Sequence, residues 1–152
     1  MQSTPETRIQ ELHLTLPAEP AKPVAKYKTA VLAGNILYVS GHGPVKNTKG
    51  KVGKELTLEQ GKEAARDVGL NILATVRHTL GSLNKVKRLV KTLGMVNATP
   101  EFRDQPKVIN GFSELMAEVF GEDAGVGARS AVGMGSLPAD IPVEIECIFE
   151  VN

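Results

Sequence analysis

The chain has 152 residues, a formal net charge of +1 and one cysteine, and only 4% of its residues are aromatic. This length fits one domain with a real core. The near-neutral charge and scarce aromatics argue against a polyanion-binding surface or a platform for stacking nucleic-acid bases. A lone cysteine allows no internal disulfide, and neither a signal peptide core nor an apolar run long enough to span a bilayer is present. We therefore expect a cytoplasmic protein without membrane contact.

The N-terminal residues 1–23 predict an appended helix and a linker rather than a domain. Thr4-Pro5-Glu6 is typical of a helix start, and three prolines between Leu16 and Pro23 require an extended connector. The single domain is then expected over residues 24–152.

Two strands joined by a tight turn are predicted next. The run from Tyr27 to Ala33 alternates loosely, Gly34-Asn35 marks the turn, and a strand follows from Ile36 to Ser40. A further short strand is expected between Pro44 and Val52.

Two amphipathic helices are predicted in the middle of the chain. Thr57-Leu58-Glu59-Gln60 is a capping box, and apolar residues recur at helical spacing up to Gly81. Asp104 is expected to cap the second helix, which ends at Gly121. Between the helices, a strand is expected over Val86–Val96, with a bulge at Gly94.

The C-terminal arm, from Ala128 to Val151, predicts two strands. In the second strand, alternate residues are apolar, whereas Glu144, Glu146 and Glu150 fall on the other face. If the two strands pair as a hairpin, Arg129 lies near Glu144. Such a pair is either an ion pair that ties the strands together or a site for a small carboxylate.

This element order predicts an α+β fold with a mixed sheet and two long helices on one face. The second face of the sheet should then carry apolar area beside Glu144 and Glu146. An open face of this kind is normally buried by self-association. The number of subunits does not follow from these residues.

Familiar catalytic signatures are missing. The histidines have no metal-ligand spacing and Cys147 has no partner, so no metal site is expected. The glycine pairs lack the continuation of a phosphate loop, and no serine lies in a nucleophile elbow. The basic residues Lys85, Lys87, Arg88 and Lys91 favour a solvated edge or surface over nucleic-acid binding.

Arg-Ser-x-Val at residue 129, Leu-Pro-x-Asp at residue 137 and Val-Glu-Ile-Glu-x-Ile at residue 143 together resemble the closing signature of the Rid (YjgF) family of reactive-intermediate deaminases. The resemblance extends from about Tyr27 to Val151. It implies a chorismate-mutase-like, YjgF-like fold, a homotrimer with clefts between subunits, and no cofactor. His42, Ala131 and a longer loop before Arg129 depart from the family pattern and suggest a divergent subgroup.

The resemblance also assigns candidate site residues. Arg129 corresponds to the arginine that holds the substrate carboxylate, and Glu144 to the site glutamate that positions water. The residues that correspond to the remainder of the cleft are Tyr27, Ser40, Gly41, His42, Asn110 and Ala131.

The resemblance implies hydrolytic deamination of 2-enamine or 2-imine acids to 2-oxoacids and ammonia. Two alternatives stay open at this point: binding or sensing of a small carboxylate metabolite without chemistry, and the endoribonuclease activity suggested for some members of the family.

Overall fold

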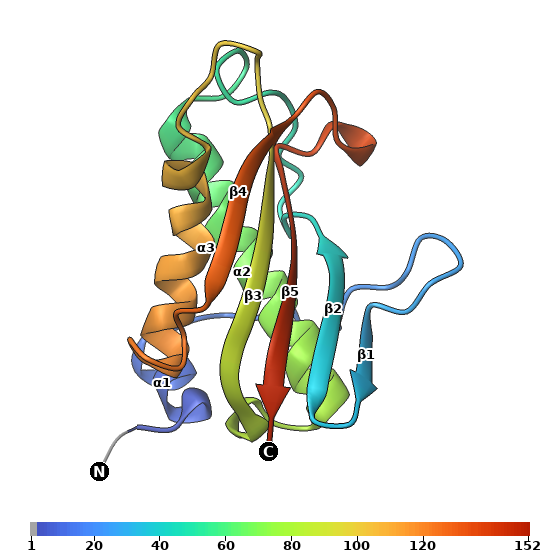
Figure 1. The fold of residues 1–152 in the computed structure, drawn as a ribbon, viewed down its shortest axis with the longest axis vertical. Helices are drawn as coiled ribbons and strands as arrows, with labels where there is room; N and C mark the ends of the chain where they lie inside the picture. Colours follow the sequence, from blue (N-terminus) through green and yellow to red (C-terminus); the bar gives the residue numbers. More distant parts are fainter. Residues whose placement is uncertain (1–2) are drawn as a thin grey trace.

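The computed structural model describes residues 3–152, which form one mixed sheet with two long helices on one side (Figure 1). The described helices and strands are, in chain order, α1 (Pro5–Glu11), β1 (Ala30–Ala33), β2 (Ile36–His42), α2 (Leu58–Leu80), η1 (Leu83–Lys85), β3 (Val86–Asn97), α3 (Gln105–Phe120), β4 (Ala128–Met134), η2 (Pro138–Asp140) and β5 (Val143–Val151). The predicted α+β class is therefore confirmed.

The five strands are ordered β1-β2-β5-β3-β4, and only β3 and β4 run parallel to each other. The chain passes from β3 to β4 through α3, as a parallel connection requires. Residues 128–134 and 143–151 therefore do not form the predicted hairpin, because β3 separates β4 from β5.

Both long helices begin and end where the sequence predicts. Thr57 Oγ1 accepts a hydrogen bond from the Gln60 amide at 3.1 Å, and Gln60 Oε1 accepts one from the Thr57 amide at 2.9 Å, so the capping box is formed. Gly81 ends α2 with a φ of 85°. At the start of α3, Asp104 occupies the cap position without a side-chain cap bond.

The core lies between these helices and the sheet. α2 packs against β2 and β5, whereas α3 packs against β3 and β4. The apolar residues that alternate along β5 are buried, as predicted: Val143, Ile145, Cys147, Phe149 and Val151.

Two details of the strand predictions are wrong. No strand forms between Pro44 and Val52, where Val52 makes only isolated bridges to Leu56 and Ala98. Gly94 is not a bulge, because the register between β3 and β5 shifts near residues 87 and 90 instead. A Cβ at Gly94 would overlap Ile109, so this glycine allows α3 to approach the sheet.

The N-terminal helix α1 packs on the outside of the helical layer, against α3 and η1. Ile9 joins the buried core, and Glu6 accepts hydrogen bonds from Arg77 and from the Leu83 amide. This segment therefore lies far from the open face of the sheet (Figure 1). Within residues 3–152, no helix combines the length and apolar character needed to cross a membrane.

Candidate functional site

Arg129 lies near the start of edge strand β4, and its side chain points toward α3. Arg129 Nη1 donates to Ser113 Oγ at 3.1 Å, and Nη2 donates to the Pro106 carbonyl at 3.2 Å. A guanidinium has five N–H groups, so these two bonds leave three for a ligand. Among residues 3–152, no carboxylate forms an ion pair with Arg129.

A cavity of about 230 Å³ opens beside this guanidinium. Asn110 and Ser113 of α3 form one wall, Leu89 and Thr92 of β3 line the cavity floor, and residues 125–127 of the loop before β4 close one side. The structure thus brings Arg129 and Asn110 together, as the resemblance implied. A cation with unused donors in a small cavity is suited to holding a carboxylate.

Glu144 lies on the open face of the sheet. The carboxylate packs over Gly41 of β2, where a side chain would overlap Glu144 Oε2. No hydrogen bond or ion pair from Glu144 is formed to any residue in 3–152. Burial raises the pKa of the Glu144 carboxyl, and the neighbouring charge of Glu146 raises this pKa further. A carboxyl whose pKa is raised in this way is a better proton acceptor than an ordinary glutamate.

Arg129 and Glu144 are not neighbours in the folded chain, which corrects the hairpin interpretation. Arg129 pairs with Thr92 of β3, whereas Glu144 pairs with Met95 of β3. These two positions on β3 are an odd number of residues apart, so they face opposite sides of the sheet. One chain therefore cannot bring both side chains to the same small ligand.

Ser40 and Gly41 of β2 lie on the Glu144 side of the sheet, and Tyr27 lies exposed in the segment before β1. Ser40 Oγ donates to the Lys28 carbonyl at 2.6 Å, which fixes the segment that follows the exposed Tyr27. Ala131 lies two residues after Arg129 on β4 and faces the core on the same side. The candidate residues thus form two separate groups, one with Arg129 and one with Glu144.

The side chain of His42 belongs to neither group. A register shift between Val39 and His42 turns this ring toward α2, where it is only 4% exposed. His42 Nε2 lies 2.8 Å from Thr75 Oγ1, and Nδ1 lies 2.6 Å from the Ser40 carbonyl. Burial lowers the pKa of His42, although the Ser40 carbonyl opposes this effect, so the ring is neutral and acts as a link within the core.

Ser113 is a site residue that the sequence analysis missed. It lies three residues after Asn110, so both side chains face the Arg129 cavity from α3. The signal available in the sequence was the position of this serine, a polar residue about one helical turn after Asn110.

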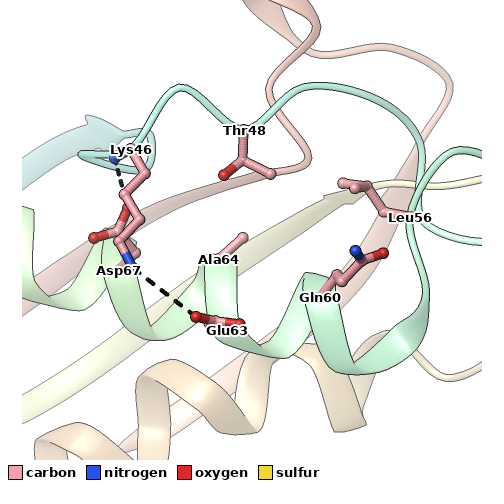
Figure 2. A pocket seen from close by; sticks show the side chains of 7 residues that line it. All are labelled: Lys46, Thr48, Leu56, Gln60, Glu63, Ala64 and Asp67. Atoms are coloured by element: carbon pink, nitrogen blue, oxygen red, sulfur yellow. Dashed lines mark hydrogen bonds and ion pairs between the residues drawn. The ribbon is translucent and has the colours of Figure 1, made fainter.

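A second cavity, shown in Figure 2, contains none of the predicted site residues. This cavity of about 180 Å³ lies between α2 and the loop after β2. The Lys46 amide donates to Asp67 Oδ2 at 2.8 Å, and Lys46 Nζ lies 3.9 Å from Glu63 Oε1. Both carboxylates of this cavity thus have a partner on Lys46. No cluster of three or more metal-binding side chains occurs within residues 3–152.

Comparison with known proteins decides the family. The sequence pattern of the family described as endoribonuclease L-PSP matches residues 18–151. The chain belongs to this family, which is the Rid (YjgF) family. A relative from Trypanosoma cruzi, protein TCP17, is 39% identical over 148 residues, which cover 95% of this chain and 92% of the relative. A RutC family protein from Pyrococcus horikoshii is 34% identical over 127 residues, covering 84% and 88% of the two chains.

Solved structures agree with the fold. A protein of unknown function from Agrobacterium tumefaciens is 40% identical, has a TM-score of 0.88, and is matched over 97% of this chain and 92% of its own. RidA from an Antarctic Psychrobacter is 28% identical with a TM-score of 0.58, over 88% and 94% of the two chains. The Agrobacterium and Trypanosoma matches extend into the N-terminal segment of this chain, before the start of the family pattern.

Proposed function

We propose that this protein hydrolyses reactive 2-imine and 2-enamine acids to 2-oxoacids and ammonia, at a site that two copies of the chain build together. The observation that carries the proposal is that the candidate residues form two groups, one around Arg129 and one around Glu144. Arg129 has three unused N–H donors beside a cavity, Glu144 has an unpaired carboxyl with a raised pKa, and the two lie on opposite faces of one sheet. Membership of the Rid family supports this activity.

In the proposed site, Arg129 binds the substrate carboxylate. Its planar guanidinium can offer two parallel N–H bonds to a carboxylate. The Ser113 hydroxyl and the Pro106 carbonyl each accept a hydrogen bond from the guanidinium, which limits the rotation of the Arg129 side chain before the ligand binds. Asn110 lines the same cavity and can complete the hydrogen bonds of the ligand, together with the backbone near Ala131.

Glu144 of the neighbouring copy supplies the proton transfers. The carboxylate accepts a proton from water as the water oxygen bonds to the C=N carbon, and the carboxyl then gives this proton to the imine nitrogen. Glu144 next transfers the hydroxyl proton of the carbinolamine to its amino group, the C–N bond breaks to release ammonia, and the hydroxyl oxygen becomes the carbonyl of the 2-oxoacid. Imines hydrolyse readily, so positioning and proton transfer can supply the catalysis. An enamine enters the same route after its β-carbon takes up a proton.

The open face of the sheet supports assembly of the two half-sites. This face carries apolar side chains that the described residues do not cover completely: Val31, Tyr38, Leu93, Met95, Val132 and Ile148. Within residues 3–152, strand β4 also has no neighbouring strand on its outer edge. A homotrimer that places the β4 edge of one copy against the Glu144 face of the next would bury this area and complete the site.

The test is ammonia release from freshly generated 2-iminopropanoate. We expect the wild-type protein to accelerate release over the spontaneous rate, and we expect Arg129→Ala and Glu144→Gln to abolish the acceleration. Arg66→Ala is the matched control, because Arg66 pairs with Glu118 on the helical surface, outside both half-sites. Equal rates for the wild type and Arg129→Ala would reject the mechanism.

The wild type and Arg129→Ala also distinguish two other activities from the proposed deamination. A sensor of small carboxylates would bind 2-oxoacids in calorimetry without any turnover of the imine. The family description favours a test for ribonuclease activity as well. RNA cleavage that survives repurification and is lost in Arg129→Ala would support an intrinsic nuclease, whereas cleavage that persists in this variant would not arise from this site.

A further inference from the structure

A different cavity lies at the opposite end of β4, where the two parallel strands β3 and β4 end together (Figure 1). Its volume is about 530 Å³, which is within the range of pockets that hold small organic ligands. The cavity shares no lining residue with the one beside Arg129. The carboxyl ends of parallel strands are a common place for ligands in sheets covered by helices.

Two cations line this cavity without a carboxylate partner. Lys51 Nζ donates to Asn97 Oδ1 at 2.8 Å and to the Gly135 carbonyl. Both acceptors are neutral, so they fix the ammonium in place without a direct ion pair within residues 3–152. The ammonium has three N–H groups, and one of them is therefore unused.

The second cation is Arg103, an exposed side chain whose Nη1 donates to the Pro100 carbonyl at 3.4 Å. Among residues 3–152, no carboxylate forms an ion pair with Lys51 or Arg103, although Glu101 lies next to Phe102 in the chain and Asp140 is linked to Lys51 through Asn97. Asp104 lies 3.6 Å from Lys107, and Asp140 accepts from Asn97 Nδ2 at 3.3 Å. No acidic residue lines the cavity. Its net charge therefore favours an anion.

The remaining wall combines apolar surface with the polar side chains of Thr99 and Gln105. Phe102 contributes an aromatic ring, and Ala98 and Met134 contribute aliphatic surface. Gly133 and Gly135 add backbone without side chains on the β4 side. A pocket whose lining combines two cations and an aromatic side chain suits a ligand that has an anionic head and a flat apolar body.

We propose that this cavity, which we name the Lys51 pocket, binds a small aromatic anion. The carboxylate or phosphate group lies against Lys51 and Arg103, and the ring lies against Phe102 and Ala98. Nothing in this proposal depends on the deaminase activity.

The test uses Arg129→Ala protein labelled with ¹⁵N, so that the proposed carboxylate site beside Arg129 is removed. Benzoate and phenyl phosphate are titrated separately, and the amide resonances of Gly133 and Gly135 are followed. We expect saturable shifts at both glycines with both anions. The tighter of the two ligands then assigns the head group as a carboxylate or as a phosphate.

Arg103→Glu, introduced into the same protein, is expected to weaken binding by about tenfold or more, because the substitution reverses a charge at the ligand head. Arg103 is exposed, so this variant should fold. Benzyl alcohol has the ring without the charge and should produce no saturable shift. Absent shifts with both anions, unchanged affinity in Arg103→Glu, or equal binding of benzyl alcohol would each overturn the proposal.

Discussion

Arg129 and Glu144 lie on opposite faces of one sheet, with β3 between the strands that carry them. The contacts of Arg129 with Ser113 and Pro106 fix its side chain on the helical side, whereas Glu144 packs over Gly41 on the open side. A reaction that uses both groups therefore requires two copies of the chain. This requirement leads to the first prediction.

Inactive variants of the two residues should restore activity when they are mixed. If Arg129→Ala and Glu144→Gln are unfolded and refolded together in equal amounts, about one quarter of the sites combine an intact Arg129 from one copy with an intact Glu144 from the next. We therefore expect about one quarter of the wild-type rate of ammonia release.

The controls are each variant refolded alone, which should stay inactive, and a mixture that is not unfolded, which should gain activity only as fast as subunits exchange. A refolded mixture without any recovery would contradict a site shared between copies.

The charge of Glu146 should tune the pH dependence of the proposed reaction. Burial, and then the charge of Glu146, raises the pKa of Glu144. A general base works in its deprotonated form, so activity is lost as the pH falls through this raised pKa. Removing the charge with Glu146→Gln lowers the pKa of Glu144, and we expect the acidic limb of the kcat/KM profile to move to lower pH.

Glu150→Gln is the matched control for this shift. Glu150 lies on the same strand, but its carboxylate pairs with Lys87 at 3.0 Å and does not contribute to the pKa of Glu144. The acidic limb should stay in place in this variant. An unchanged profile in Glu146→Gln would show that Glu144 is not the titrating base.

Two glycine substitutions should separate loss of activity from loss of stability. A methyl group at Gly41 would overlap Glu144 Oε2, which is the far end of a flexible side chain and can rotate away. A methyl group at Gly94 would overlap Ile109, which is fully buried and has no free space. We expect Gly41→Ala to reduce ammonia release with little change in stability, and Gly94→Ala to destabilise the fold by about 1–3 kcal/mol.

Chemical unfolding measures the free energy of unfolding for both variants, and the ammonia assay measures their activity. The Gly41→Ala,Glu144→Ala double variant serves as the control, since it removes the overlap and should be no less stable than Glu144→Ala. Strong destabilisation by Gly41→Ala would mean that the glycine is needed for the backbone rather than for the carboxylate.

The sequence predicted the faces of the strands better than their neighbours. Alternation along residues 143–151 correctly separates the buried residues from Glu144 and Glu146, because side chains alternate by geometry. Which strand lies beside which depends on contacts far apart in sequence. The short connection between residues 134 and 143 indicated a hairpin, yet β4 pairs with β3 after the α3 crossover.

The resemblance implied that His42 lines the cleft, whereas its side chain lies in the core. Strict alternation from Leu37 and Val39, which are buried, would place residue 41 inside and His42 outside. The register shift at Ser40-Gly41 adds one residue to this strand and turns His42 inward. The resemblance did place Arg129 and Asn110 at one cavity, since it carries information about three-dimensional position that periodicity lacks.

The last prediction concerns the N-terminal helix, which the carboxylate of Glu6 ties to the helical layer. Glu6 accepts from Arg77 at 2.7 and 3.2 Å and from the Leu83 amide at 2.8 Å. Burial alone would raise the pKa of Glu6, but the bonds from Arg77 and Leu83 outweigh this effect and lower the pKa. We expect Glu6→Gln to lower the free energy of unfolding by about 1–2 kcal/mol at neutral pH.

The pH dependence identifies the charge as the cause. Because the pKa of Glu6 is lower in the folded protein than its ordinary value, the stabilisation is present above that ordinary value and is lost as the pH falls through the folded pKa. The difference in Tm between the wild type and Glu6→Gln should therefore shrink on acidification. Glu11→Gln on the same helix is the control, because Glu11 is exposed and pairs only with Arg8 and Ser3, so its effect on Tm should be smaller. A difference for Glu6→Gln that stays constant down to acidic pH would show that shape, rather than the carboxylate charge, holds α1 in place.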